Sequence, residues 1–262
     1  MSDTPFIPIL TFHGLVRSKG ASANSLYTLT EDQFADQMRY LSENHYHSVS
    51  LEAVMTWVKG EPLPERSIAI TFDDGRESDF SIARPILKRH GCVATFFVNP
   101  GTLGQAGYLR YQELRQMSAE EMEIGSHGFD HLFLTQLDEK GLRHQIAGSK
   151  ERLEQLLQKE ILFFSVPRGR YTPHILEIVK ETGYRAACTS EIGLNQRDLD
   201  LYHLKRWAMK RPYTLDDFIS VVEGTPKGNL LFEHFLKRSA HRILGHTLYE
   251  ALRNKMVKEE IS

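Results

Sequence analysis

Two adjacent carboxylates, Asp73 and Asp74, follow an apolar run from Ser67 to Phe72. Neighbouring side chains on an extended segment point in opposite directions, so these two carboxylates can do separate work. One can bind a metal ion while the other accepts a proton. The alternative is a solvated Asp-Asp-Gly turn, which is common between elements of secondary structure, and the dipeptide alone favours that turn.

A second group of polar residues reads Ser-His-Gly-Phe-Asp-His from Ser126 to His131. It places His127 and His131 four residues apart, and the neighbouring glycines favour a loop. Two histidines and one carboxylate can bind a divalent ion and leave coordination positions open. The chain has 12 histidines, so such a spacing also arises by chance; the alternative is a pair of surface or hydrogen-bonded core histidines.

A third group lies between Phe164 and Tyr171, where Arg168 and Arg170 follow another apolar run. An arginine at the end of a strand can hold a carboxylate through two parallel hydrogen bonds. Taken alone, such a segment is more often a solvated loop.

Short apolar runs alternate along the chain with amphipathic stretches, which is typical of a parallel α/β sheet or barrel. In these folds the chemistry gathers at the carboxyl ends of the strands, where all three polar groups fall. Thr30 and Gln33 form a capping-box pattern that predicts the start of a helix. The predicted strands cover 6–12, 47–51, 67–72, 92–98, 122–124, 161–166 and 186–189, and the predicted helices follow Thr30 and cover 52–59, 80–89, 141–157 and 174–182.

The composition indicates a globular protein and excludes several classes. The chain has 262 residues, 41% of them hydrophobic, and a net charge of -2, which argues against a disordered chain and against a broad basic face for nucleic acid. Its two cysteines exclude a disulfide framework and a Cys-only zinc cluster. Since no repeat or linker divides the sequence, one main domain is the simpler interpretation.

The first residues, MSDTPFIPILTFHGL, lack the basic start and the long apolar run of a signal peptide. No later stretch approaches the roughly 18 continuous apolar residues of a membrane span. These patterns predict a cytoplasmic protein, with peripheral contact at the inner membrane face as a further expectation.

Together, TFDDG at 71–75, SHGFDH at 126–131 and FSVPRG at 164–169 resemble, in order and spacing, the motifs of the polysaccharide deacetylases. This is the NodB-homology domain of carbohydrate esterase family 4. The similarity runs from about Ile9 to Trp207. It implies an α/β fold, a distorted (β/α)7 barrel, with a catalytic domain over 1–215 and a helical extension over 216–262.

The resemblance also implies the chemistry. Asp73 corresponds to the catalytic base, and Asp74, His127 and His131 correspond to the ligands of one divalent metal ion, with zinc first and cobalt, nickel or manganese as alternatives. The implied reaction removes the N-acetyl group from N-acetylhexosamine units of a polysaccharide or of a lipid-linked precursor, during exopolysaccharide or surface-glycan assembly. The implied partner is an N-acetylated glycan, and no nucleic acid is expected.

The third motif departs from the family pattern, which usually places an arginine soon after the Phe and a tyrosine after the Pro. Here those positions hold Ser165 and Arg168. We therefore expect Arg168 or Arg170 to orient the base. The segment Pro167–Gly169, which includes Arg168, is the implied site of substrate and oxyanion contacts.

The family's late Leu-x-His strand, which supplies the acid for the leaving amine, is not evident after Trp207. His13 instead follows an apolar strand near the start of the chain, which resembles the permuted order of some biofilm poly-N-acetylglucosamine deacetylases. We therefore predict His13 as the general acid. The alternatives are that His13 caps its strand or packs under Trp207, in which case His203 or His234 is the next candidate.

Two further alternatives concern function. Relatives of this barrel also act on other small amides, so a deacylase or deformylase is one, and the altered third motif suggests a catalytically inactive glycan-binding barrel as another. The residues from 216 to 262 are interpreted as a helix covering the barrel, or as a basic amphipathic surface that reaches membrane-bound glycans.

Overall fold

The computed structural model describes residues 5–17 and 25–231. The chain separates into two compact units, residues 1–218 and 219–262. The sheet and the site described below belong to the first unit, and helix α8 (Leu215–Val222) crosses the boundary between the two. The predicted domain boundary after residue 215 remains a prediction, and from residue 232 on the predicted helical extension lies outside the described residues, as does His234.

A curled parallel sheet forms the centre of the first unit. Its strands run in the order β10-β1-β5-β6-β7-β8-β9. The short strand β4 pairs with the first half of β5, and β6 pairs with the second half. Every pairing in this sheet is parallel, as the alternation of apolar and amphipathic segments predicts. The strands are β1 (Ile9–Phe12), β4 (His47–Val49), β5 (Ser67–Phe72), β6 (Thr95–Val98), β7 (Glu123–Ser126), β8 (Phe163–Ser165), β9 (Ala186–Cys188) and β10 (Trp207–Ala208), and a small separate sheet pairs β2 (Gly14–Val16) with β3 (Thr28–Thr30).

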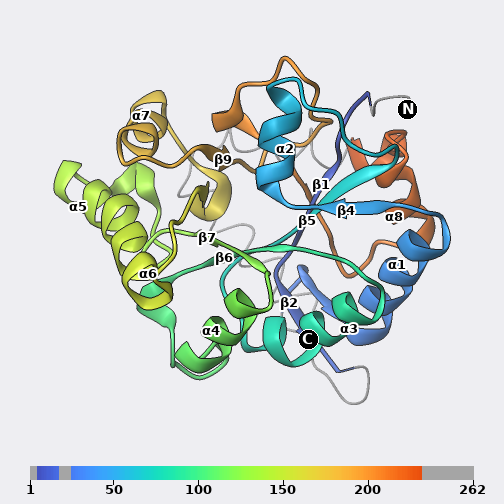
Figure 1. Ribbon diagram of the computed structural model, residues 1–262, viewed down its shortest axis with the longest axis horizontal. Helices are drawn as coiled ribbons and strands as arrows, with labels where there is room; N and C mark the ends of the chain where they lie inside the picture. The colour runs from blue at the N-terminus through green and yellow to red at the C-terminus, as the bar shows by residue number, and fades with distance from the viewer. Residues whose placement is uncertain (1–4, 18–24, 232–262) are drawn as a thin grey trace. The chain divides into compact units, whose positions relative to one another are not determined.

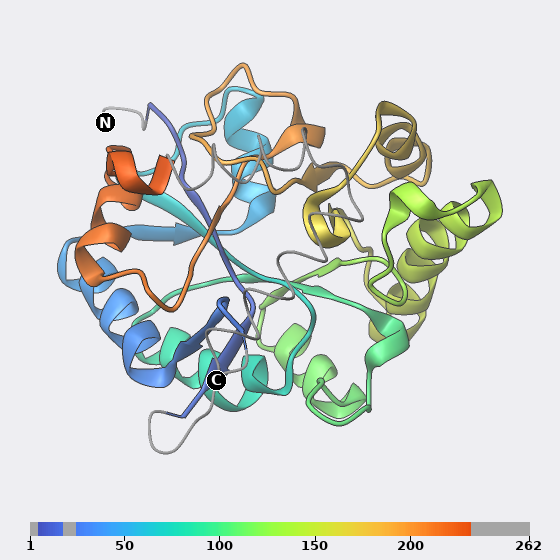
Figure 2. The same cartoon turned by 180° about the vertical axis from the view of Figure 1, so that it is seen from behind.

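In the first unit, helices lie around the outside of these strands (Figures 1 and 2). The predicted helix over 80–89 is a π-helical turn followed by α3, and the predicted helix over 141–157 is α5, a second π-helical turn and α6 in succession. The helices are α1 (Glu31–Glu43), α2 (Leu51–Val58), α3 (Arg84–Arg89), α4 (Tyr111–Ala119), α5 (Glu139–Arg143), α6 (Ser149–Leu157), α7 (Pro173–Glu181) and α8 (Leu215–Val222), with π-helical turns at Asp79–Ala83 and His144–Gly148 and 3₁₀ turns at Pro100–Thr102, Leu134–Gln136, Pro167–Gly169 and Leu201–His203.

The segment that leads into β10 joins the two ends of the sheet. Leu204 forms a parallel bridge with Cys188 of β9, and three residues later Trp207 pairs with Leu10 of β1. The sheet therefore curls back on itself, with seven strands along its path. This confirms the expected distorted (β/α)7 barrel.

Four phenylalanines pack at the ends of β1, β5 and β6, and all are fully buried. The rings of Phe72 and Phe96 stack with centroids 4.9 Å apart, and Phe12 stacks on Phe72 at 5.3 Å. Phe34, from α1, meets Phe12 edge-on at 5.0 Å. Aromatic pairs of this kind add stability beyond the area they bury. They fix the strand ends from which the polar residues project.

The predicted capping box at the start of α1 is confirmed, since Thr30 Oγ1 accepts the Gln33 N–H and Gln33 Oε1 accepts the Thr30 N–H. Both cysteines are free and buried. Among the described residues, no helix combines the length and apolar character that a membrane crossing requires.

Candidate active site

The carboxyl ends of four strands carry the polar groups that the sequence singled out. His13 follows β1, Asp73 follows β5, His127 follows β7, and Ser165 ends β8. Strand pairing aligns these ends, because Phe12 lies beside Phe72 and Ser126 lies beside Phe164. Parallel strands thus bring residues far apart in sequence to one edge of the sheet.

Asp73 is buried, with 3% of its surface exposed, and it is held by an arginine. Arg206 donates from Nη1 to Oδ1 and from Nη2 to Oδ2, each over 2.8 Å, while Ser165 Oγ donates to Oδ2 over 3.2 Å. Burial is the largest single influence and raises the pKa of Asp73, but the charges of Arg206 and His127 and the hydrogen bonds from Arg206 together outweigh it, so this pKa lies below its ordinary value. Asp73 is therefore ionised and fixed in orientation.

The arginine on Asp73 is a correction to the sequence analysis, which expected Arg168 or Arg170 there. Both of these guanidiniums instead lie over the ring of Phe133, at 4.3 and 5.4 Å from its centroid. Arg168 lies in the turn after β8 with a φ of 56°, in the left-handed region, and its side chain packs on Phe133. Arg206 approaches Asp73 from the segment that closes the barrel.

Asp74 has a backbone φ of 79°, in the left-handed region. Its Oδ2 accepts two hydrogen bonds from the Arg76 guanidinium, at 3.0 and 3.3 Å. Its Oδ1 is buried and has no hydrogen-bond partner among the described residues. A strained, non-glycine residue with an unsatisfied buried oxygen is typical of a functional site.

A buried carboxyl, Asp79, braces the turn that carries Asp74. Its Oδ2 accepts the Arg76 N–H over 2.9 Å, and burial raises its pKa well above the ordinary value. The backbone of Arg76 is thus fixed by Asp79 while its side chain fixes Asp74. Sequence reasoning missed this residue, whose only signal is an acidic residue at the start of an amphipathic stretch.

Three ligand atoms, from Asp74, His127 and His131, lie within 4.8 Å of one another. The Nε2 atoms of His127 and His131 are 3.7 and 3.3 Å from Asp74 Oδ1. His127 Nδ1 lies 2.9 Å from the Ser165 carbonyl, which can only accept, so Nδ1 carries the proton and Nε2 presents a lone pair. A ring-nitrogen lone pair that faces the Asp74 carboxylate oxygen is repelled by it unless a cation lies between them. These three residues therefore fit a divalent metal ion.

Burial affects the second histidine ligand, His131. The pKa of His131 is about 4, lowered first by burial and then by the charge of His127, while Asp74 opposes the shift and Arg168 adds to it. At neutral pH its ring nitrogen is therefore free to bind a metal. Like Asp74, His131 has a positive φ, 57°.

Two amide side chains fix the loop between the histidines. Asn99 Nδ2 donates to the carbonyls of His127 and Gly128, and Gln145 Oε1 accepts the N–H groups of Phe129 and Asp130, each over 2.9 Å. The loop is thus held by the residue that follows β6 and by the π-helical turn before α6. The expected loop, rather than a helical pair of histidines, is confirmed.

His13 lies on the same side of the sheet as the carboxylates. Burial lowers its pKa, and the charges of Asp73 and Asp74 oppose that shift. The imidazole therefore interacts electrostatically with both carboxylates. Its ring lies 5.1 Å from that of Tyr27, and its buried Nδ1 has no hydrogen-bond partner among the described residues. The alternative candidate His203 pairs with Asp200 over 2.9 Å near the surface.

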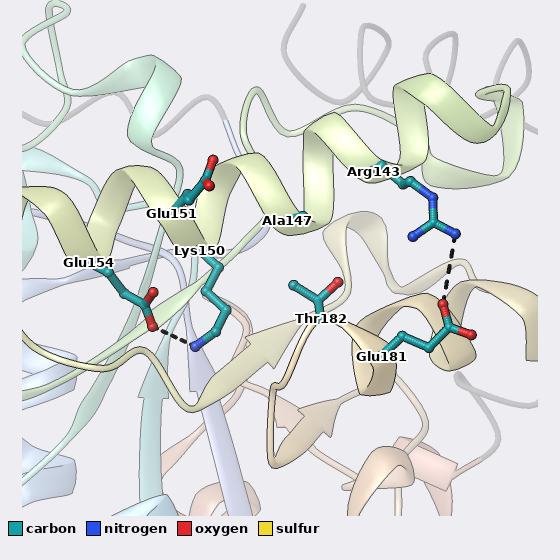
Figure 3. A pocket seen from close by; sticks show the side chains of 7 residues that line it. All are labelled: Arg143, Ala147, Lys150, Glu151, Glu154, Glu181 and Thr182. Atoms are coloured by element: carbon teal, nitrogen blue, oxygen red, sulfur yellow. Dashed lines mark hydrogen bonds and ion pairs between the residues drawn. The ribbon is translucent and has the colours of Figure 1, made fainter.

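A pocket elsewhere on the protein carries no site residue. Figure 3 shows it beside α6 and the end of α7, where its charged side chains form pairs, Lys150 with Glu154 and Arg143 with Glu181. Because these charged side chains pair with one another and none is a predicted site residue, we assign ligand binding to the strand ends and not to this pocket. The pocket is lined by Arg143, Ala147, Lys150, Glu151, Glu154, Glu181 and Thr182.

Comparison with known proteins gives this arrangement a family. Residues 60–187 match the family described as polysaccharide deacetylase. Over 201 residues, which cover 76% of this chain and 70% of the relative, the chain is 30% identical to the Bacillus subtilis (strain 168) protein named "Putative polysaccharide deacetylase YxkH". The chain belongs to the polysaccharide deacetylase family.

Other relatives share the fold or part of the sequence. The Streptococcus pyogenes deacetylase PplD in complex with acetate superimposes with a TM-score of 0.78 at 25% identity, covering 84% of this chain and 99% of that one. IcaB from Ammonifex degensii has the same fold, with a TM-score of 0.72, 23% identity and coverage of 86% and 99%. The poly-β-1,6-N-acetyl-D-glucosamine N-deacetylase of Staphylococcus aureus (strain MSSA476) is 24% identical over 61% of this deacetylase and 60% of its own length.

Within this deacetylase, Arg206 should be essential to the stability of the buried Asp73. Replacing Arg206 by Gln leaves a buried carboxylate without its counter-charge, and we expect the free energy of unfolding at neutral pH to fall by about 3–5 kcal/mol, measured by urea denaturation. The pKa of Asp73 is depressed in the folded state, so the pair stabilises above the unfolded pKa of about 3.9, and this contribution is lost as pH falls through the lower folded value. The difference in the free energy of unfolding between wild type and variant should therefore shrink in acid.

A double variant, Asp73→Asn with Arg206→Gln, should recover part of the lost stability. Equal instability of the single and double variants would contradict the assignment.

Proposed function

We propose that this polysaccharide deacetylase removes the N-acetyl group from N-acetylhexosamine units of a polysaccharide or of a lipid-linked glycan precursor. The observation that carries the proposal is the convergence of the three ligand atoms of Asp74, His127 and His131 beside an ionised, buried Asp73. The names of two relatives support N-acetylglucosamine as the sugar: the staphylococcal enzyme named above, and the peptidoglycan-N-acetylglucosamine deacetylase of Bacillus cereus, which is 31% identical over 49% of this chain.

We propose zinc as the metal, ahead of cobalt, nickel or manganese. Two neutral imidazole nitrogens and one carboxylate oxygen are the ligand set of many catalytic zinc sites. When bound, such an ion polarises a carbonyl group and makes a nearby water more acidic.

The protein's own residues then have distinct tasks. Asp73 accepts the proton of the attacking water, and its hydrogen bonds from Arg206 and Ser165 keep it ionised and aimed. Asp73 Oδ2 lies 3.9 Å from His127 Nε2, so the base sits directly beside the ligand set. The Pro167–Gly169 turn is our candidate for contacts to the substrate and to the oxyanion.

His13 is our candidate for the acid that protonates the leaving amine, which makes this chain a member of the subgroup with permuted motif order. Its support is its position after β1, beside the strand that carries Asp73, and the unpartnered Nδ1. A buried ring nitrogen without a protein partner is unusual in a native structure, and a catalytic role is one of the few explanations for it. His203, paired with Asp200, offers no comparable group.

The proposed function is tested by acetate release from a panel of neutral and charged N-acetylated oligosaccharides, with and without a chelator and added Zn²⁺ or Co²⁺. We expect acetate release that chelation abolishes and added metal restores.

His127→Ala should lose bound metal and activity together, while far-ultraviolet circular dichroism shows that the fold is retained. His203→Ala, the control, should keep both the metal and the activity. Stoichiometric metal in His127→Ala, by elemental analysis, would remove the ligand set, and failure of every substrate would favour the inactive glycan-binding alternative.

The two adjacent carboxylates should separate into two roles. Asp73→Asn is expected to keep the metal and to lose about 10²–10⁴-fold in kcat, because general-base help is of that size. Asp74→Asn is expected to lose metal affinity. Metal content and turnover, measured on the same preparations, distinguish the two; metal loss in Asp73→Asn but not in Asp74→Asn would reverse the roles.

His13→Ala should keep metal and substrate binding and lose kcat. An acid acts in its protonated form, so wild-type kcat should fall as pH rises through the pKa of His13, and this high-pH limb should vanish in the variant. The profile of kcat against pH is the measurement, with His203→Ala as the matched control. Near-normal kcat with both limbs intact in His13→Ala would exclude this residue and bring His203 or His234 forward.

A further inference from the structure

Arg168, within the candidate substrate turn, presents an exposed guanidinium that neither orients Asp73 nor belongs to the metal ligands. Its guanidinium carbon lies 4.3 Å from the centroid of the Phe133 ring, over one face. Among residues 5–17 and 25–231, no carboxylate lies within ion-pair distance of it. A guanidinium stacked on an aromatic ring keeps its N–H edge free, and that edge matches the two oxygens of a phosphate or carboxylate.

The charges of the site explain why this guanidinium matters. Asp73 is balanced by Arg206, and Asp74 is balanced by Arg76 over 3.0 Å. Each buried carboxylate thus has its own counter-charge before any metal ion is considered. Arg168 is therefore an excess positive charge at the edge of the site, although the whole chain carries a net charge of -2.

The local backbone holds Arg168 beside the ligand loop. The preceding residue, Pro167, packs next to Gly128, between the two histidine ligands, and Phe133 follows the ligand His131 by two residues. The next residue, Gly169, lies against Ser190 so closely that no side chain fits there. Arg168 itself is held at a φ of 56°, which sets the direction of its side chain.

We propose that Arg168 is a specificity-determining residue that selects an anionic glycan, by binding a phosphate or carboxylate group on the sugar next to the one that carries the acetamide. This inference rests on the proposed deacetylation and names its substrate class. The position of Arg168 supports it, because the ring of Phe133 fixes the guanidinium beside the ligand loop while its edge stays exposed. A phosphate group and a carboxylate group each present two anionic oxygens, so the guanidinium can bind either.

The test compares three N-acetylated oligosaccharides of equal length: a neutral one, one with a phosphodiester on the neighbouring sugar, and one with a carboxylate there. For wild type, kcat/KM should be higher for an anionic substrate than for the neutral one, and this preference should decrease at high salt. In Arg168→Gln the preference should fall about five- to tenfold, through KM. Any effect of the substitution on the main chain acts on all three substrates, so the ratio isolates the guanidinium.

Two further variants sharpen the result. Arg168→Lys keeps the charge without the planar fork and should retain only part of the preference. Arg152→Gln is the matched control, since Arg152 is an exposed guanidinium over another ring, that of Tyr111. It should leave the ratio of kcat/KM between anionic and neutral substrates unchanged.

The relative rates of the phosphodiester and carboxylate substrates identify which anion is used. Turnover of the neutral substrate with no anionic preference, or a preference that survives in Arg168→Gln, would overturn the inference while leaving deacetylation intact; no turnover of any substrate would instead reject the proposed function.

Discussion

The buried pair of Asp73 and Arg206 is the interaction on which the site depends. Two charges removed from water each carry a large desolvation cost, and only close geometry with further hydrogen bonds offsets it. Here the guanidinium makes two bonds to the carboxylate, and it also donates to the carbonyl of Thr189 and to the hydroxyl of Ser165. With both partners satisfied, the carboxylate stays ionised inside the protein, where a proton acceptor would otherwise be neutralised by burial.

This pair also ties the chemistry to the closure of the barrel. Arg206 lies between Leu204, which bridges β9, and Trp207, which pairs with β1. Asp73 directly follows β5, and Ser165 ends β8. The guanidinium can therefore reach the carboxylate only when the closing segment is in place across the sheet. A loose end of the sheet would leave the base without its counter-charge, so the fold and the ionised state of the site stabilise each other.

Much of this arrangement can be predicted from sequence, for physical reasons that are specific to each part. Strand β5 is clear because its residues form an apolar run that ends abruptly in two carboxylates. The carboxylates alone favour a solvated turn and the histidine spacing alone also arises by chance, so the metal ligands are predicted only by the order and spacing of the three motifs together. Arg206 was missed because its partner is 133 residues away and β10 has only two residues, too few for a periodic pattern. The signal that could have found it is a Lys-Arg pair between the apolar Leu204 and Trp207. Asp79 was missed because nothing in a sequence marks a carboxyl as buried.

The third motif shows how one requirement can be met from a different strand. The base needs a guanidinium against its carboxylate, and the family pattern supplies one soon after the Phe of that motif. Here that position is Ser165, whose small side chain leaves room for Arg206 and adds a hydroxyl to the same network. Because Arg206 satisfies the base, the arginine of the Pro-Arg-Gly turn has no carboxylate to hold inside the site. It lies instead on the ring of Phe133, at the exposed edge, where its charge acts on what approaches the site.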